Sequence, residues 1–113
     1  MPTSIICNKN DKNYFIYSAG RSLTLYSINE SKIIREINNY TYGISATTIR
    51  KDGLVMVTGD EEGRVEVKDT KEKFNLRVFD QCKKRIGCLE YYGQDLYAAG
   101  DDLVIRLYDV AAG

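Results

Sequence analysis

The sequence predicts an all-β protein built from repeated antiparallel units of about forty residues. Three observations predict this class: a repeat of that period, short segments in which apolar and polar residues alternate, and turn residues between the segments. No sustained helical periodicity occurs, and the single proline is Pro2. We therefore expect strands joined by tight turns, with alternate side chains on opposite faces of each sheet.

The repeat is clearest in three apolar segments, at residues 14–20, 54–59 and 96–100, that end in glycine. These glycines are spaced by 39 and 41 residues along the chain and are Gly20, Gly59 and Gly100. A polar turn and then an alternating run follow each of them. The runs align by two apolar positions with one polar residue between, and the aligned sets are Leu23, Val65 and Ile105, and Leu25, Val67 and Leu107. We expect each run to form a strand with one inward face.

Further strands complete each unit. First strands are expected at residues 5–7, 45–49 and 86–89, and fourth strands at 32–37 and 74–79. Lys51-Asp52-Gly53 is a hairpin signal, because glycine tolerates the positive φ that tight turns require. Asp60-Glu61-Glu62-Gly63 and Asp101-Asp102 are the expected turns before the alternating runs. The predicted units span about residues 4–37, 44–79 and 86–109, and the last unit has no fourth strand.

This pattern resembles the WD40 family, whose β-propeller blades have four strands and an aromatic-Asp pair at the end of the third. Tyr108-Asp109 is the best match, while Lys68-Asp69 keeps only the acid and Tyr26-Ser27 only the ring. The chain has no histidine and no tryptophan, so the buried His–Ser–Asp–Trp network of family members cannot form. The resemblance implies that residues 1–113 are a partial WD40-type β-propeller of about three blades.

Residues 46–65 are similar to the early blades of the U3 small nucleolar RNA-associated protein 15 family, which has a Phe-Arg-x-Asp-Gly run like Ile49-Arg50-Lys51-Asp52-Gly53. The similarity extends over about residues 14–110, including Leu76-Arg77-Val78-Phe79. It implies a component of the small-subunit processome in the nucleolus, acting in ribosomal RNA transcription and processing. Other processome subunits would be its partners, with weak or indirect contact to pre-ribosomal RNA. That family also has a C-terminal helical region, so this chain would be part of such a protein.

Three blades are too few to form a ring, because closed propellers have about four to eight. The missing outer strand of the third unit also leaves a row of backbone donors and acceptors unpaired. Either the chain is a fragment of a longer protein, or several copies pair blade against blade. We expect the isolated fragment to self-associate.

Composition restricts the function. Sixteen basic and sixteen acidic residues cancel, which argues against a dedicated electrostatic binder of nucleic acid. Histidine, the commonest general base and metal ligand, is absent. Cys7, Cys82 and Cys88 match no zinc spacing and are expected as reduced thiols. We therefore expect no enzymatic activity, no metal and no cofactor, and, without a signal peptide or membrane span, an intracellular protein with no membrane partner.

Candidate partner-binding residues lie in the connections between units. Tyr40 and Tyr42 are in the first connection, and Lys83, Lys84 and Arg85 are in the second. Such connections cluster on one face of a propeller, where exposed tyrosines favour binding. Burial between blades is the alternative for the tyrosines, and a solvated loop is the alternative for the basic run.

These observations predict a scaffold that binds several protein partners. A WD40 adaptor in another pathway, such as trafficking or ubiquitin ligation, remains open. An enzyme or a ligand-binding propeller with a central acidic site is a weaker alternative, because the acids are expected at solvated turns. The fold alone does not choose among these functions.

Overall fold

The computed structural model describes residues 5–9, 14–70, 75–80 and 82–108. Within these residues eleven strands form three antiparallel sheets, and no helix occurs. We call the sheets blades 1, 2 and 3. Blade 1 contains β1 (Ile5–Lys9), β2 (Tyr14–Ala19), β3 (Ser22–Ser27) and β4 (Lys32–Ile37); blade 2 contains β5 (Ile44–Ile49), β6 (Val55–Asp60), β7 (Val65–Asp69) and β8 (Asn75–Phe79); blade 3 contains β9 (Ile86–Tyr92), β10 (Asp95–Gly100) and β11 (Ile105–Tyr108). The predicted all-β class is confirmed.

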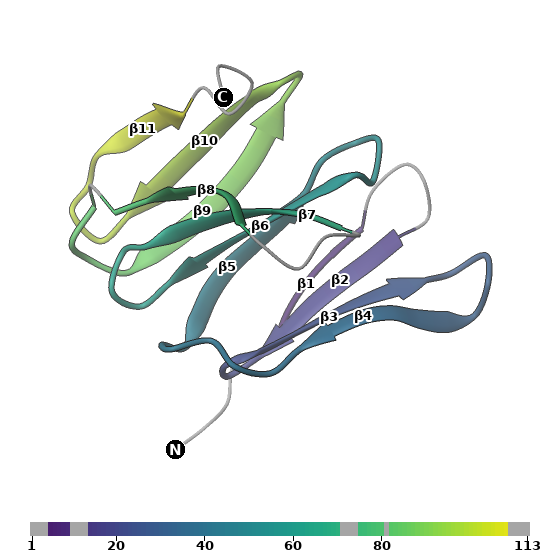
Figure 1. The fold of residues 1–113 in the computed structure, drawn as a ribbon. Coiled ribbons are helices and arrows are strands. Elements are labelled where there is room, and N and C mark those ends of the chain that lie inside the picture. The colour runs from purple at the N-terminus through teal and green to yellow at the C-terminus, as the bar shows by residue number, and fades with distance from the viewer. Residues whose placement is uncertain (1–4, 10–13, 71–74, 81, 109–113) are drawn as a thin grey trace.

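The blades lie side by side in chain order, with blade 2 between the other two (Figure 1). The first strand of each blade forms the edge at which the blades meet most closely. β5 contacts β1 and β2 on one side and β9 on the other, and β6 also contacts β9. Neighbouring strands within a blade are also neighbours in sequence, so each blade is a meander of local hairpins.

Two apolar layers fill the spaces between the blades. Blade 1 packs on blade 2 through Ile16, Leu23, Leu25, Tyr40, Ile44, Ile49 and Met56. Blade 2 packs on blade 3 mainly through Val55, Val57, Val65, Val67, Ile86, Leu89, Leu96, Ala98 and Tyr108. The Tyr108 ring stacks on Phe79 of β8 with centroids 4.1 Å apart. Each blade therefore buries its apolar face only by having a neighbour, as in other repeat proteins.

The predicted alignment of the third strands is confirmed by the strand pairing. Leu25 lies opposite Ile16, Val67 opposite Val57, and Leu107 opposite Tyr97; the three pairs occupy equivalent places in their blades. Their burial differs. Leu25 and Val67 are buried, whereas Leu107 is 55% exposed, because the described residues form no blade beyond blade 3.

The predicted alignment of the three glycines is wrong. The cross-strand partners of the aligned residues Leu23, Val65 and Ile105 are Ser18, Gly59 and Ala99. Gly59 lies within β6 and Gly100 ends β10, while Gly20 lies in the turn between β2 and β3. The segment between the paired residues of the second and third strands is one residue shorter in blade 1 than in the other two blades. An alignment of the glycines by residue type therefore does not follow the strand pairing.

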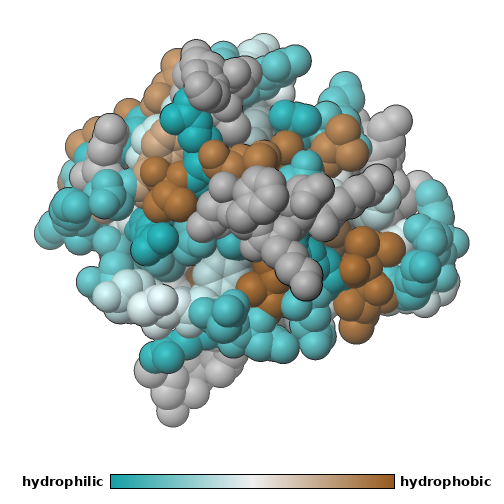
Figure 2. Space-filling model, viewed as in Figure 1, coloured by the Kyte–Doolittle hydropathy of each residue, from teal (hydrophilic) through white to brown (hydrophobic). Residues whose placement is uncertain are grey.

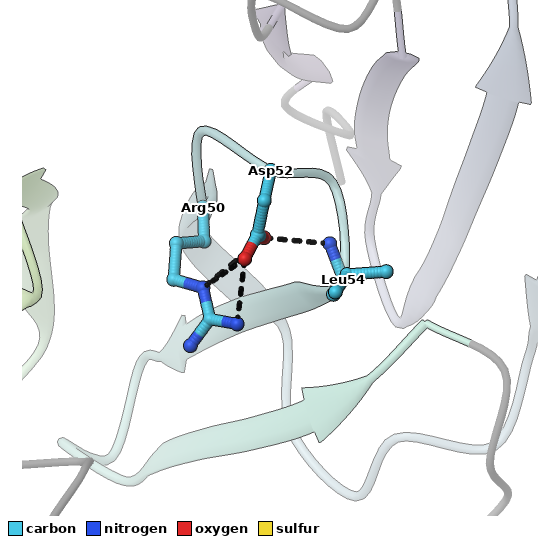
Figure 3. A network of polar contacts seen from close by, with 3 residues as sticks. All are labelled: Arg50, Asp52 and Leu54. Atoms are coloured by element: carbon cyan, nitrogen blue, oxygen red, sulfur yellow. Dashed lines mark hydrogen bonds and ion pairs between the residues drawn. The ribbon is translucent and has the colours of Figure 1, made fainter.

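The predicted hairpin at Lys51-Asp52-Gly53 is confirmed as the turn from β5 to β6. Gly53 has a φ of 77°. The Asp52 carboxylate accepts hydrogen bonds from Arg50 Nε at 3.0 Å, from Arg50 Nη2 at 2.8 Å and from the Leu54 backbone N–H at 2.9 Å (Figure 3). One side chain thus holds both ends of the turn.

Pro2, Asp109 of the Tyr108-Asp109 pair and residue 74, the first residue of the predicted strand 74–79, lie outside the described residues. Within the described part, blade 3 has three strands and no fourth. That part of the chain also contains no helix long and apolar enough to cross a membrane.

Candidate interaction surface

Both connections between blades lie at one end of the molecule. The turn that joins the second and third strands of each blade lies at the same end. We call this end the loop face and define it as residues 20–21, 38–43, 60–64, 82–85 and 100–104. The first connection is held to blade 1 by two backbone hydrogen bonds, from Tyr40 N–H to the Arg21 carbonyl at 3.4 Å and from Ile44 N–H to the Gly20 carbonyl at 2.8 Å. The loop face is therefore fixed to the blades by its own backbone.

Two further backbone hydrogen bonds repeat one contact in successive blades. Glu61 N–H donates to the Gly43 carbonyl at 3.0 Å, and Asp101 N–H donates to the Arg85 carbonyl at 2.9 Å. In each case the turn before the third strand is joined to the connection that enters the same blade. Gly43 and Arg85 are therefore equivalent positions, as are Glu61 and Asp101.

The second connection lies directly on a turn of the preceding blade. Gly63 has a φ of 90°, and a Cβ added there would be 2.3 Å from the Cys82 carbonyl oxygen and 2.6 Å from that of Lys84. Only glycine combines this backbone conformation with such a close approach. Blade 2 thus supports the connection that carries the predicted basic run.

Tyr40 is buried between blades, which was the alternative interpretation in the sequence analysis. The residue is 8% exposed and belongs to the layer between blades 1 and 2. The Lys68 ammonium lies 5.5 Å from its ring centroid. Burial raises the pKa of the Tyr40 hydroxyl to about 12. Its side chain anchors the first connection and does not present a surface to a partner.

Cys82 has the equivalent place in the second connection. It is 1% exposed, and its Sγ donates to the Lys84 carbonyl at 3.1 Å. Tyr40 and Cys82 each lie three residues before the carbonyl, of Gly43 or Arg85, that accepts the repeated hydrogen bond. The sequence analysis missed this equivalence because the two side chains differ. The available signal was that each residue lies the same distance before the first strand of the next blade, which begins at Ile44 or Ile86.

The remaining predicted residues are exposed on the loop face. Tyr42 is 44% exposed, and Lys83, Lys84 and Arg85 are exposed in the next connection. The Arg85 guanidinium lies 3.9 Å from the Asp101 carboxylate. The structure thus places these four residues on one end of the molecule, in adjacent connections.

The sequence analysis missed Leu103, an apolar residue at the tip of the turn between β10 and β11. It is 93% exposed and has a φ of 63°. Glu61 and Glu62, also exposed, flank the two connections. The only available signal for this position was a leucine that follows two aspartates in a predicted turn.

The acidic turn residues organise the turns. Asp60 Oδ1 accepts from the backbone N–H groups of Glu62 at 2.9 Å and Arg64 at 3.0 Å. Asp102 accepts from Val104 N–H at 3.2 Å and from Arg106 at 2.7 Å, and the hydrogen bond from Arg106 lowers the pKa of Asp102. Among the described residues, no group of three or more histidine, cysteine, aspartate or glutamate side chains is placed to hold a metal ion.

A cavity of about 190 Å³ lies between blades 1 and 2, beside the first connection. Its lining residues are Ile37, Asn39, Tyr40, Thr41, Arg64, Glu66 and Lys68. The charged residues pair with one another: the Glu66 carboxylate lies 3.7 Å from Arg64 and 3.6 Å from Lys68. A charged ligand would have to displace these ion pairs, so the loop face is the stronger candidate site.

No protein-family model matches the sequence. The chain is 23% identical over 114 residues to U3 small nucleolar RNA-associated protein 15 of Schizosaccharomyces pombe, and the alignment covers 98% of this chain. The chain spans only 23% of the length of that relative. The predicted resemblance to this family is confirmed as a distant one.

Two solved structures share the fold. The structure of RRP9 WD40 repeats superposes with a TM-score of 0.83 at 16% identity, covering 99% of this chain and 37% of the other. A chain of the mitotic checkpoint complex superposes with a TM-score of 0.81 at 19% identity, covering 94% of this chain and 34% of the other. The three sheets are therefore blades of a WD40-type β-propeller.

Proposed function

We propose that this chain is a non-enzymatic WD40 scaffold that binds protein partners through its loop face, and that these partners are subunits of the small-subunit processome in the nucleolus. The observation that carries the proposal is the way the backbone of the loop face is held to the blades. Buried Tyr40 and Cys82 and the repeated backbone hydrogen bonds fix the two connections, so the exposed residues between them are presented from a backbone that is already in place. Such preorganisation lowers the entropic cost of association.

The charge pattern of the loop face supports a protein partner over RNA. Basic Lys83 and Lys84 lie in the same connection as Arg85, which approaches Asp101, while Glu61 and Glu62 are exposed at the preceding turn. Binding of a phosphate backbone relies on a largely positive surface. A mixed surface with Tyr42 and Leu103 exposed matches the composition of protein interfaces better. Contact with pre-ribosomal RNA is proposed only as weak or indirect.

The processome part of the proposal is supported by the distant similarity to U3 small nucleolar RNA-associated protein 15. A WD40 adaptor of another pathway would use the same loop face, so the identity of the partners separates the two. An enzymatic propeller has less support, because Asp60 and Asp102 are engaged in holding their turns.

The experiment is an affinity purification of the tagged chain from its own cells, with and without ribonuclease, followed by mass spectrometry. The test variant is Tyr42→Ala with Lys84→Glu. The matched control is Leu76→Ala with Lys51→Glu, because Leu76 is 43% exposed and Lys51 lies in the exposed turn at the opposite end of blade 2. Both variants truncate one large exposed side chain to alanine and replace one lysine by glutamate.

We expect the wild-type chain and the control to recover ribosome-assembly factors in a ribonuclease-resistant manner, and the test variant to lose them at least tenfold. Equal recovery by both variants would remove the loop face from the proposal. Recovery that ribonuclease abolishes would assign binding to RNA. A partner set without ribosome-assembly factors would favour an adaptor of another pathway and overturn the processome assignment.

A further inference from the structure

We propose that the cavity between blades 1 and 2 receives one acidic side chain, an aspartate or a glutamate, of a protein partner bound to the loop face. This inference rests on the proposed function and names the chemistry of one contact within it. The cavity has a volume of about 190 Å³, far more than one water molecule occupies. Its lining includes Asn39, Thr41 and Arg64, which are exposed residues of the loop face. The cavity is therefore open to a partner that binds there.

The cavity and its surroundings are polar. Figure 2, viewed as in Figure 1, shows mainly hydrophilic surface at the lower left, where the turns of the loop face lie. Within the cavity, Ile37 and the ring of Tyr40 supply the hydrophobic surface, and the other lining side chains are polar or charged. An apolar side chain would gain little by entering, because it would remove water from charged groups without replacing their interactions.

The charges in the lining do not balance. Arg64 and Lys68 contribute two positive charges, and Glu66 contributes one negative charge. A single carboxylate from a partner would bring the set to neutrality. The balance matters most at Lys68, because only 11% of its side-chain surface is accessible and electrostatic interactions are stronger where water is excluded.

The two cations differ in depth. Arg64 has 45% of its side-chain surface accessible, whereas Lys68 has 11%, so Arg64 lies nearer the mouth of the cavity and Lys68 lies further inside. The Lys68 ammonium is 5.5 Å from the centroid of the Tyr40 ring, a distance at which the ring attracts a cation. Buried Tyr40 thus helps to hold the inner cation. An entering carboxylate would meet Arg64 first and then approach Lys68.

The ion pair that an entering carboxylate has to displace is a weak one. The Glu66 carboxylate lies 3.7 Å from Arg64 Nε and 3.6 Å from Lys68 Nζ, and both distances are longer than those of hydrogen bonds. An ion pair at an exposed cation such as Arg64 contributes little to stability. A guanidinium, by contrast, can bind a carboxylate through two parallel hydrogen bonds. The partner's carboxylate can therefore replace Glu66 on Arg64 while Glu66 keeps Lys68.

The positions of the cations favour a protein side chain over the backbone of a nucleic acid. A carboxylate stands at the end of a narrow, flexible side chain and can reach between two blades. A phosphodiester carries its charge between two sugars, so it would contact Arg64 at the mouth and stay further from Lys68. The observed arrangement of one outer and one inner cation therefore suits an acidic side chain.

The test is an NMR titration of the isotopically labelled chain with N-acetyl glutamate N-methylamide, a blocked glutamate with one side-chain carboxylate. The equivalent blocked glutamine is the uncharged control ligand, and dimethyl phosphate represents a phosphodiester. We expect millimolar binding of blocked glutamate, with chemical-shift changes at the Arg64 Nε–H and at the backbone N–H groups of Asn39 and Thr41. Dimethyl phosphate should bind more weakly, and blocked glutamine should not bind.

Two variants of the lining should change this binding in opposite directions. Arg64→Gln should weaken the binding of blocked glutamate about tenfold, as expected for the loss of a hydrogen bond to a charged group, and it keeps the backbone N–H that donates to Asp60. Glu66→Gln should strengthen the binding, because the competing carboxylate is removed. Lys84→Gln is the matched control, because Lys84 is an exposed cation of the loop face outside the cavity lining. The amide spectrum of each variant checks that it is folded.

Equal binding of blocked glutamate by the wild-type chain and folded Arg64→Gln would overturn the proposal, as would tighter binding of dimethyl phosphate. In the affinity purification described above, Arg64→Gln should recover less of the partner proteins, and full recovery would show that no partner side chain uses the cavity. The proposed function fails separately. If the variant Tyr42→Ala with Lys84→Glu loses its partners but blocked glutamate does not bind the wild-type chain, only the assignment of the cavity is wrong.

Discussion

Gly59 of β6 lies directly against the side chain of Ile86 in β9. A Cβ added to Gly59 would be 2.5 Å from Ile86 Cγ2. The hydroxyl of Ser45 in β5 donates to the Ile86 carbonyl and lies 3.3 Å from the Gly59 carbonyl oxygen. Blades 2 and 3 therefore approach each other closely at the ends of their strands next to the loop face, and glycine at position 59 permits this approach.

The variant Gly59→Ala should lower the free energy of unfolding by about 1 to 3 kcal/mol, the usual cost of overpacking a core. The matched control is Gly87→Ala on the neighbouring strand β9, where an added Cβ would meet its nearest atoms at 3.7 and 3.8 Å. That control should be neutral or slightly stabilising, because alanine is less flexible than glycine in the unfolded chain. Urea denaturation measures both, and equal midpoints for the two variants would contradict the packing argument.

Tyr40 predicts a loss of stability at high pH. Burial raises its pKa from 10.0 to about 12 in the folded chain, so the folded state holds this proton more tightly than the unfolded state does. The contribution is fully present below pH 10, where both states are protonated, and it is lost as the pH rises through the folded value. A shift of this size corresponds to about 2 to 3 kcal/mol.

The check on Tyr40 compares the stability of the wild-type chain and of Tyr40→Phe at pH 8 and at pH 11. Every other ionisable group is common to the two proteins, so the difference between them isolates Tyr40. The decrease from pH 8 to pH 11 should be smaller in the variant. An identical decrease would show that Tyr40 is not the buried group that titrates.

The turn in Figure 3 gives a prediction at low pH. The hydrogen bonds from Arg50 hold the pKa of Asp52 below its ordinary value of 3.8. This interaction stabilises the fold above the ordinary pKa and is lost as the pH falls through the lowered one. Since both side chains are partly exposed, with 29% and 43% of their surface accessible, its contribution should stay under about 1 kcal/mol.

Carbon-detected NMR titration of the Asp52 carboxyl measures this shift. The wild-type chain should give a pKa below 3.8, and Arg50→Gln should raise it toward that value. Lys32→Gln is the control, because the Lys32 ammonium pairs with Glu30 at 3.3 Å in another blade. A carboxyl that titrates alike in all three proteins would mean that the turn is not held by this pair.

The alternation of apolar and polar residues predicted the order of the strands along the chain. It did not predict which of the equivalent apolar residues are buried. Leu25, Val67 and Leu107 are equivalent both in sequence and in strand pairing. The first two are buried and the third is exposed, because burial of a blade face depends on a neighbouring blade and not on the strand itself. Periodicity reports which side a residue faces, and says nothing about what stands on that side.

The connections show where sequence reasoning ends. Tyr40 and Tyr42 are the same residue type two positions apart, yet one is 8% and the other 44% exposed. A connection lacks the two-residue alternation of a strand, so the sequence does not indicate which of its side chains point into the protein. Tyr40 packs in the layer between blades 1 and 2 and its N–H donates to the Arg21 carbonyl, and these contacts depend on how segments far apart in sequence meet.

Cysteine reactivity should report on the burial of the second connection between blades. Cys82 in that connection is buried and hydrogen-bonded to the Lys84 carbonyl, whereas Cys88 in β9 is exposed. In a Cys7→Ser background, Ellman's reagent at low protein concentration should modify Cys88 rapidly and Cys82 slowly, since access governs thiol reactivity. Equal rates at the two cysteines would contradict the burial of Cys82 in the second connection.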